Sequence, residues 1–193
     1  PDSLFKNKRS EIVNKLADQY KFFHNELEFI EVFKERGGFD VIVGNPPWVS
    51  IQFDEKSVLG VVYPELLIRN NSASEVAKMS GNLMDSSLIM NLYYLDLIDS
   101  ESMQCFQSSK VNYPLLVGQK NNLYKSVILN SFKTINSRGI CGLLHPEGVY
   151  EDPKSREFRK ELFSRLRYHF EFKNELMLFS EVHHHQKFSI NIY

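Results

Sequence analysis

The stretch FDVIVGNPPWV, residues 39–49, decides the fold of this chain. Its apolar, β-branched run at 41–43 lies between the glycine pair at 37–38 and Gly44. Such a run is typical of a strand buried on both faces of a parallel sheet. Open α/β sheets bind their ligands beyond the carboxyl ends of their strands. Residues 45–48 therefore stand where we expect a functional site.

Residues 45–48, Asn-Pro-Pro-Trp, fit the methylation of an amino group on a nucleobase. An exocyclic amine is a poor nucleophile because its lone pair is delocalised into the ring. The side-chain oxygen of Asn45 and the backbone carbonyl of Pro46 can each accept one amino hydrogen, which directs the lone pair towards a methyl donor. Pro46 and Pro47 restrict the backbone and hold these acceptors in place. Trp48 offers an aromatic face for a base that has left the stack. A rigid exit turn with an ordinary packed aromatic is the alternative interpretation.

The rest of the chain predicts helices and strands in alternation. Apolar residues three and four apart predict helices over about 9–23, 83–98, 121–136 and 153–166. Gly139 is expected to stop the third of these helices before a buried strand at 140–145. Two more strands are expected near 168–173 and 187–193. Strand, helix, strand, helix, strand is the pattern of a doubly wound sheet with right-handed crossovers.

The chain resembles the adenine-specific, S-adenosylmethionine-dependent DNA methyltransferases of large restriction-modification and phage-defence proteins. FDVIVG followed by Asn-Pro-Pro-Trp looks like motif IV of these enzymes. The other segments that match in order are residues 22–24 (FFH), 26–29 (ELEF), 32–33 (VF), 122–124 (NLY), 139–146 (GICGLLHP), 181–182 (EV) and 187–189 (KFS). Their joint occurrence is more specific than the tetrapeptide alone.

The resemblance implies an α/β fold, the C-terminal half of a Rossmann-like doubly wound methyltransferase sheet with an inserted, mainly helical segment. It implies methyl transfer from S-adenosylmethionine to the exocyclic amino group of adenine flipped out of double-stranded DNA. We expect the chain to be part of a longer restriction-modification protein, and whether a nuclease or specificity domain is fused to it stays open at this point. The expected parts are residues 1–38 (lead-in helix and linker), 39–49 (strand and motif IV), 50–118 (insertion) and 119–193 (remaining sheet and helices).

Site residues follow from the resemblance one at a time. Asn45 and Pro46, with Pro47 beside them, match the amino-group acceptors, and Trp48 matches the base-stacking aromatic. A second aromatic usually comes from the loop between the last two strands, where the alignment places His183. The glycine-rich turn that binds S-adenosylmethionine in the family is absent, since no Gly-x-Gly occurs in the 193 residues. The cofactor-binding residues therefore stay unassigned, and we expect the chain alone to be inactive.

Composition narrows the remaining possibilities. The chain is 42% hydrophobic and 24% charged with a net charge of −1, as in an ordinary globular domain, and we expect a cytoplasmic protein without a membrane segment. Cys105 and Cys141 are expected to be reduced and buried. No metal site is expected, because the adjacent histidines at 183–185 cannot all point at one ion. Basic residues crowd the helix at 153–166, as a solvated face or as a phosphate contact.

Other functions stay open at this point. Asn-Pro-Pro followed by an aromatic also serves the methylation of amino or amide groups in RNA and in protein glutamine, although those small enzymes usually lack an insertion like 50–118. The missing glycine-rich turn favours a third possibility, a non-catalytic DNA-recognition module.

Overall fold

The structure, a computed structural model, describes residues 7–68, 74–76, 78 and 86–193. Its strands form one mixed sheet in the order β1-β2-β4-β3. They are β1 (Phe39–Gly44), β2 (Ile135–Pro146), β3 (Tyr168–Lys173) and β4 (Lys187–Ile192). β1 is parallel to β2, while β4 is antiparallel to both β2 and β3. The carboxyl ends of β1, β2 and β3 therefore lie at the same edge of the sheet.

The α/β class is confirmed, with a difference in the last strand. β1, β2 and β3 run in the same direction and are connected through helices, as the alternating pattern predicts. β4 instead returns from β3 as a hairpin through residues 174–186 and inserts between β2 and β3. Sequence alternation does not encode this order, because a hairpin and a crossover can both follow a strand.

The helices fall into three groups along the chain. Before β1 come α1 (Lys8–Tyr20), α2 (Asn25–Glu28) and α3 (Ile30–Arg36). Between β1 and β2 come α4 (Glu55–Val62), α5 (Glu65–Ile68), α7 (Ser87–Ser108), the 3-10 helix η1 (Pro114–Leu116) and α8 (Leu123–Thr134). After β2 come α9 (Gly148–Glu151), η2 (Pro153–Ser155), α10 (Arg156–Arg165) and η3 (Asn174–Leu176).

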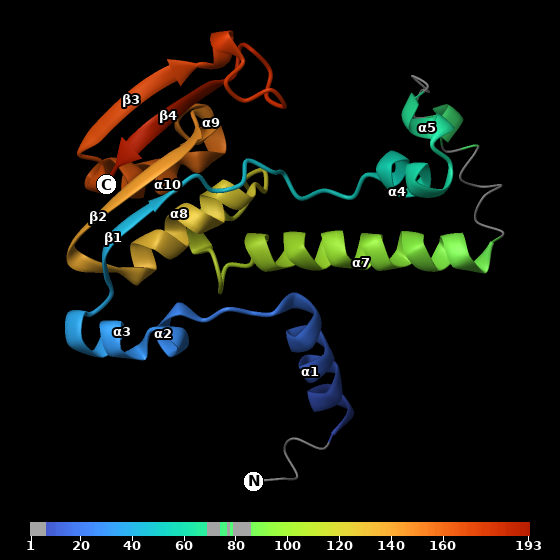
Figure 1. The fold of residues 1–193 in the computed structure, drawn as a ribbon, viewed down its shortest axis with the longest axis horizontal. Coiled ribbons are helices and arrows are strands. Elements are labelled where there is room, and N and C mark those ends of the chain that lie inside the picture. Colours follow the sequence, from blue (N-terminus) through green and yellow to red (C-terminus); the bar gives the residue numbers. More distant parts are fainter. Residues whose placement is uncertain (1–6, 69–73, 77, 79–85) are drawn as a thin grey trace.

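The main core lies between one face of the sheet and the helices α8, α9 and α10 (Figure 1). Cys141 and Leu143 of β2 point into it and meet Ile128 of α8 and Phe158 and Leu162 of α10. These side chains are almost completely buried. Full burial contributes about 1.5 to 3 kcal/mol for each large apolar side chain, so this layer holds the sheet and its three helices together.

The opposite face of the sheet is largely uncovered, which corrects the expectation for β1. Val41 and Val43 are 63% and 80% exposed. Paired residues of neighbouring strands share a face. Ile140 pairs with Val41, and Phe170 pairs with Ile190. Both Ile140 and Phe170 are exposed on this side of the sheet. The β-branched run indicates an apolar strand, but it does not indicate whether helices cover both of its sides.

Gly139 has a different role from the expected helix stop. α8 already ends at Thr134, and Ile135 pairs with Phe39 at the start of β2. The register then shifts so that Val41 pairs with Ile140. A Cβ atom on Gly139 would lie 2.4 Å from Cγ1 of Ile135 and 2.8 Å from the carbonyl oxygen of Phe39. Gly139 therefore permits a close approach of β1 at an irregularity in the pairing.

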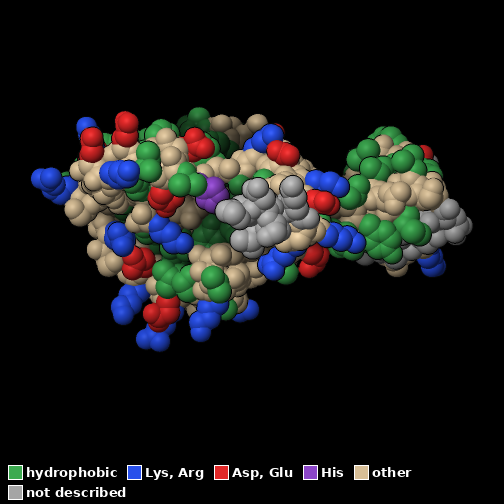
Figure 2. Space-filling view, turned by 90° about the horizontal axis from the view of Figure 1, so that it is seen from below, with side chains coloured by type: hydrophobic (Ala, Val, Ile, Leu, Met, Phe, Trp, Pro, Cys, Tyr) green, Lys and Arg blue, Asp and Glu red, His purple; other side chains and the backbone are tan. Residues whose placement is uncertain are grey.

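The described residues of 50–118 form helices and no strand. Leu59, Leu66 and Ile89 make a small separate core where α4, α5 and the start of α7 meet, away from the sheet (Figure 1). In Figure 2, hydrophobic side chains cover much of the part formed by α4, α5 and the start of α7. Acidic and basic side chains are interspersed over the rest of the molecule. Cys105 on α7 is exposed, contrary to expectation, because little packs against this helix along its length. None of the described helices combines the length and apolarity needed to cross a bilayer.

Candidate functional site

The Asn-Pro-Pro-Trp segment leaves the carboxyl end of β1 as an extended loop. Gly44, the last residue of β1, pairs with Leu143 of β2. The side chain of Asn45 is exposed and makes no hydrogen bond within the described part of the chain, while Pro46 is buried. The amide of Asn45 thus faces solvent from a backbone that a buried proline anchors, as an acceptor for an incoming group requires.

Trp48 is fixed by one hydrogen bond and two aromatic contacts. Its indole Nε1 donates to the carbonyl oxygen of Leu144 at 3.3 Å. Its ring lies 4.9 Å from that of Phe179 and 5.8 Å from that of Phe188, both tilted, measured between ring centroids. The side chain is only partly buried. It is therefore oriented by protein contacts and still presents part of its surface outward.

The loop after Trp48 is fastened to the amino end of α8. The backbone N–H of Leu123 donates to the carbonyl oxygen of Val49 at 2.9 Å, and Ser50 Oγ donates to that of Asn121 at 2.9 Å. The side chain of Asn122 caps α8 by accepting from the N–H of Tyr124 at 3.4 Å. The NLY segment at 122–124 thus begins this helix and also holds the end of the loop that carries residues 45–48, called the acceptor loop below.

The second aromatic near Trp48 is Phe179, from the loop between β3 and β4. The sequence placed His183 in this role. His183 comes from the same loop but is exposed, and its ring contacts are with His184 and His185. Asn174 shapes the loop by donating from Nδ2 to the carbonyl oxygens of Phe179 at 2.9 Å and Val182 at 2.8 Å. An aromatic residue within LMLFS, residues 176–180, was the only sequence signal for Phe179.

A buried polar network lies behind the site, centred on His145 near the end of β2. Its Nδ1 lies 3.0 Å from the carbonyl oxygen of Pro146, and its Nε2 lies 2.9 Å from both Tyr193 Oη and Asn191 Nδ2. The ring stacks on Tyr124 at 5.6 Å. Burial lowers the pKa of His145 to about 4. This histidine is therefore neutral near pH 7 and makes a structural contribution.

Lys125 and Asp152, at the same edge of the sheet, belong to a second polar cluster. Lys125 Nζ lies 3.4 Å from Asp152 Oδ2 and donates to Gln119 Oε1 at 3.0 Å. The same Gln119 oxygen accepts from Ser155 Oγ at 2.6 Å. Burial lowers the pKa of Lys125, an effect that the neighbouring Asp152 opposes. The cluster fixes α8 against the turn that precedes α10.

Two of the basic residues of α10 are engaged by other parts of the chain, while Arg156 and Lys160 are exposed. Arg159 donates to the carbonyl oxygen of Asp152. Arg165 pairs with Glu161 at 2.7 Å and lies over the ring of Phe132 at 4.8 Å. These contacts favour the interpretation of α10 as a partly paired, solvated face over a dedicated phosphate-binding surface.

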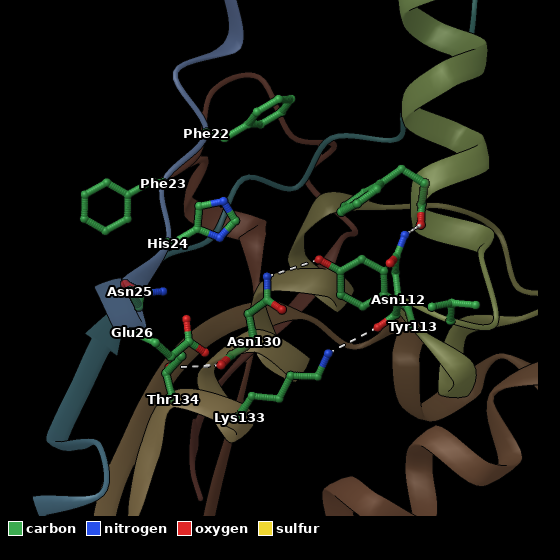
Figure 3. A pocket seen from close by; sticks show the side chains of 12 residues that line it. Phe22, Phe23, His24, Asn25, Glu26, Asn112, Tyr113, Asn130, Lys133 and Thr134 are labelled. Atoms are coloured by element: carbon green, nitrogen blue, oxygen red, sulfur yellow. Dashed lines mark hydrogen bonds between the residues drawn. The ribbon is translucent and has the colours of Figure 1, made fainter. Parts of the chain in front are cut away.

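A cavity of about 580 Å³ lies at the opposite edge of the sheet, where Thr134 precedes β2 (Figure 3). Phe22 and Phe23 line one side of it. On the other side, Asn130 Nδ2 donates to Tyr113 Oη at 3.1 Å and Lys133 Nζ to the carbonyl oxygen of Asn112 at 3.2 Å. The polar groups of Asn130 and Lys133 on α8 are therefore already hydrogen-bonded within the protein. The cavity lies between the segment that precedes β1 and helix α8, and none of residues 45–48 lines it.

Comparison with known proteins adds a family match. Residues 2–80 match the model of the Eco57I restriction-modification methylase family. No curated protein and no solved structure matches the chain. The matched segment contains β1 and the acceptor loop at 45–48. The match supports a DNA methyltransferase of the restriction-modification type.

Proposed function

We propose that this chain carries the substrate-base half of an adenine-specific DNA methyltransferase within a larger restriction-modification protein. The reaction is transfer of a methyl group from S-adenosylmethionine to the exocyclic N6 amino group of adenine in double-stranded DNA. The observation that carries the proposal is the exposed amide of Asn45 beside the partly buried indole of Trp48, at the carboxyl end of β1.

The acceptors act on the amino group before and during methyl transfer. Asn45 Oδ1 and the carbonyl oxygen of Pro46 each accept one amino hydrogen, which draws the nitrogen towards a tetrahedral geometry. Pro46 and Pro47 limit backbone motion, and the bond from Leu123 to Val49 closes the loop on its other side. The acceptors therefore need little reorganisation when the reaction occurs.

The aromatic side chains hold the extruded adenine. Trp48 provides one face, and Phe179 is better placed than His183 to provide the second, since it already lies beside the indole. The two rings now touch each other at 4.9 Å, so a base entering between them must separate them. Trp48 is bound to β2 through its indole nitrogen, so the proposal requires the ring of Phe179 to move.

The cofactor fits this chain only in part. S-adenosylmethionine supplies the methyl group when bound, but the described residues contain no strand, glycine-rich turn and helix of the kind that cradles such a ligand. We therefore propose that another part of the protein holds the cofactor. A doubly wound sheet carries helices on both faces. The uncovered face of this sheet therefore supports the proposal that another part of the protein completes the domain and holds the cofactor.

The substitution Asn45→Ala in the complete restriction-modification protein tests the proposal. Methylation measured as N6-methyladenine by mass spectrometry should fall on the order of a hundredfold or more, while affinity for duplex DNA stays within about twofold because Asn45 acts mainly in the transition state. Asn25→Ala, on α2 near the opposite edge of the sheet, is the matched control and should leave the rate unchanged. Near-normal methylation by Asn45→Ala, or methylation of RNA or protein in place of adenine in DNA, would refute the proposal.

A further inference from the structure

Three side chains with metal-ligating atoms gather across β4, from the end of β2 and from the edge strand β3. Glu147 directly follows β2, and His169 and Glu171 alternate along β3 so that both point to the same face of the sheet. One ligand atom from each of the three lies within 4.8 Å of the other two. The adjacent histidines at 183–185 contribute nothing to this cluster.

The proton on His169 can be placed from its neighbours. Asn191 Nδ2 lies 3.2 Å from the carbonyl oxygen of Ser189, which can only accept, so the amide nitrogen points there. The amide oxygen Oδ1 then faces His169 Nδ1 at 2.7 Å and accepts a hydrogen bond from its N–H. Tyr150 Oη donates to the same oxygen at 2.8 Å. The neutral imidazole of His169 therefore carries its proton on Nδ1 and a free lone pair on Nε2.

This lone pair faces a buried carboxylate. His169 Nε2 lies 3.5 Å from Glu147 Oε2, and the Glu147 side chain is only 7% exposed. The second carboxylate oxygen, Oε1, is buried and has no hydrogen-bond partner within the described part of the chain. A buried carboxylate without donors costs several kcal/mol, so the arrangement calls for a positive charge.

A second proton on His169 would supply a positive charge, but it would stabilise the Glu147 carboxylate only weakly. The 3.5 Å separation is long for a charge-assisted hydrogen bond, which normally spans about 2.7 to 2.9 Å. It also leaves Glu147 Oε1 without a partner. A metal ion bound among the three side chains accepts the lone pair of His169 and the negative charge of Glu147 together.

We propose that Glu147, His169 and Glu171 bind a divalent first-row transition-metal ion such as Mn²⁺ or Zn²⁺. One imidazole nitrogen and two carboxylates form a mixed set that suits these ions better than Ca²⁺, which prefers oxygen ligands alone. Asn191 supplies the outer hydrogen bond that orients a metal-binding histidine. Lys187 Nζ occupies only Oε1 of Glu171, at 2.9 Å, which leaves the other oxygen for the ion. The bound ion would tie the end of β2 to the edge strand β3.

Titration with Mn²⁺, followed by the electron paramagnetic resonance signal of the free ion, tests the proposal. We expect one ion per chain, with affinity at least tenfold weaker in Glu147→Gln and in His169→Gln. Glu161→Gln, which removes a 35% exposed carboxylate on α10 outside the cluster, should bind like the wild type. Lys187→Gln should bind more tightly because it removes a neighbouring cation, and weaker binding would argue against the site.

The adjacent histidines are the competing site, and alanine at 183, 184 and 185 together separates the two. Retention of Mn²⁺ binding in this triple variant supports the proposal, and its loss there with retention in Glu147→Gln overturns it. Wild-type protein gives a readout without substitution, because Zn²⁺ should shift the ¹⁵N resonance of His169 Nε2 and leave Nδ1 protonated. Absence of both Mn²⁺ binding and this shift at millimolar metal would also overturn the proposal.

Discussion

Acidification should destabilise the protein through His145. The imidazole is fully buried and sits with Nε2 2.9 Å from the Asn191 amide nitrogen, a donor that a protonated ring would oppose. Burial lowers its pKa from 6.5 to about 4. The unfolded chain, in which the ring is hydrated, therefore takes up this proton at a higher pH than the folded chain.

The sign and size of the effect follow from this difference. The contribution of His145 to stability is complete above pH 6.5, falls as the pH drops from 6.5 towards about 4, and levels off below that. The free energy of unfolding should lose about 3 kcal/mol from this residue across the window, at about 1.4 kcal/mol for each pH unit of separation. Such a loss is a large part of the total stability of a domain.

Urea unfolding measured between pH 7.5 and 4.5 checks this prediction, with Trp48 as the reporter because it is the only tryptophan. The same series on His145→Gln removes the titrating group and leaves the carboxylates unchanged, so the difference between the two pH profiles isolates His145. Direct titration of the wild type by NMR gives an independent value, with the exposed His24 as an internal control. Titration of His145 near pH 6.5, or identical pH profiles for the two proteins, would refute the reasoning.

Two further predictions concern the proposed catalytic role. The 193-residue chain should bind S-adenosylmethionine weakly or not at all by calorimetry, because no strand, glycine-rich turn and helix for the cofactor is present among its described residues, and low-micromolar binding would contradict this. In the complete protein with cofactor and duplex DNA carrying 2-aminopurine at the target position, Trp48→Ala and Phe179→Ala should each change the fluorescence of the extruded base and slow methylation, since stacking contributes about 1 to 3 kcal/mol per base. Trp48→Phe should keep much of the activity, and His183→Ala should have the smaller effect; a large effect of His183→Ala with none of Phe179→Ala would restore His183 to the stacking position.

Periodicity in the sequence predicted most of the individual elements but little of their arrangement. The helices α8 and α10 and the strand β1 were predicted near their observed positions, because spacing of apolar residues reports local structure directly. The insertion of β4 between β2 and β3 depends on tertiary pairing, which the local pattern does not contain.

The site shows the same division. Asn45 and Trp48 could be proposed from the sequence because adjacent residues form a local motif, and their roles stay predictions. The contact of Phe179 with Trp48 spans the chain, so no local pattern in the sequence pointed to it. The cluster of Glu147 and His169 likewise depends on tertiary structure, since the residue after β2 and the strand β3 bring the two side chains together.

The position of β1 at the border of the sheet has a practical consequence for work with this chain by itself. One side of the strand pairs with β2, and the backbone N–H and C=O groups on its other side have no strand beside them among the described residues. Its sequence, FDVIVG, is short, apolar and β-branched, the combination that recruits identical strands from other molecules. The isolated chain should therefore self-associate through β1 as its concentration rises. Replacing the outward-facing Val43 with lysine would place a charge on that border and keep the protein in solution for the measurements above.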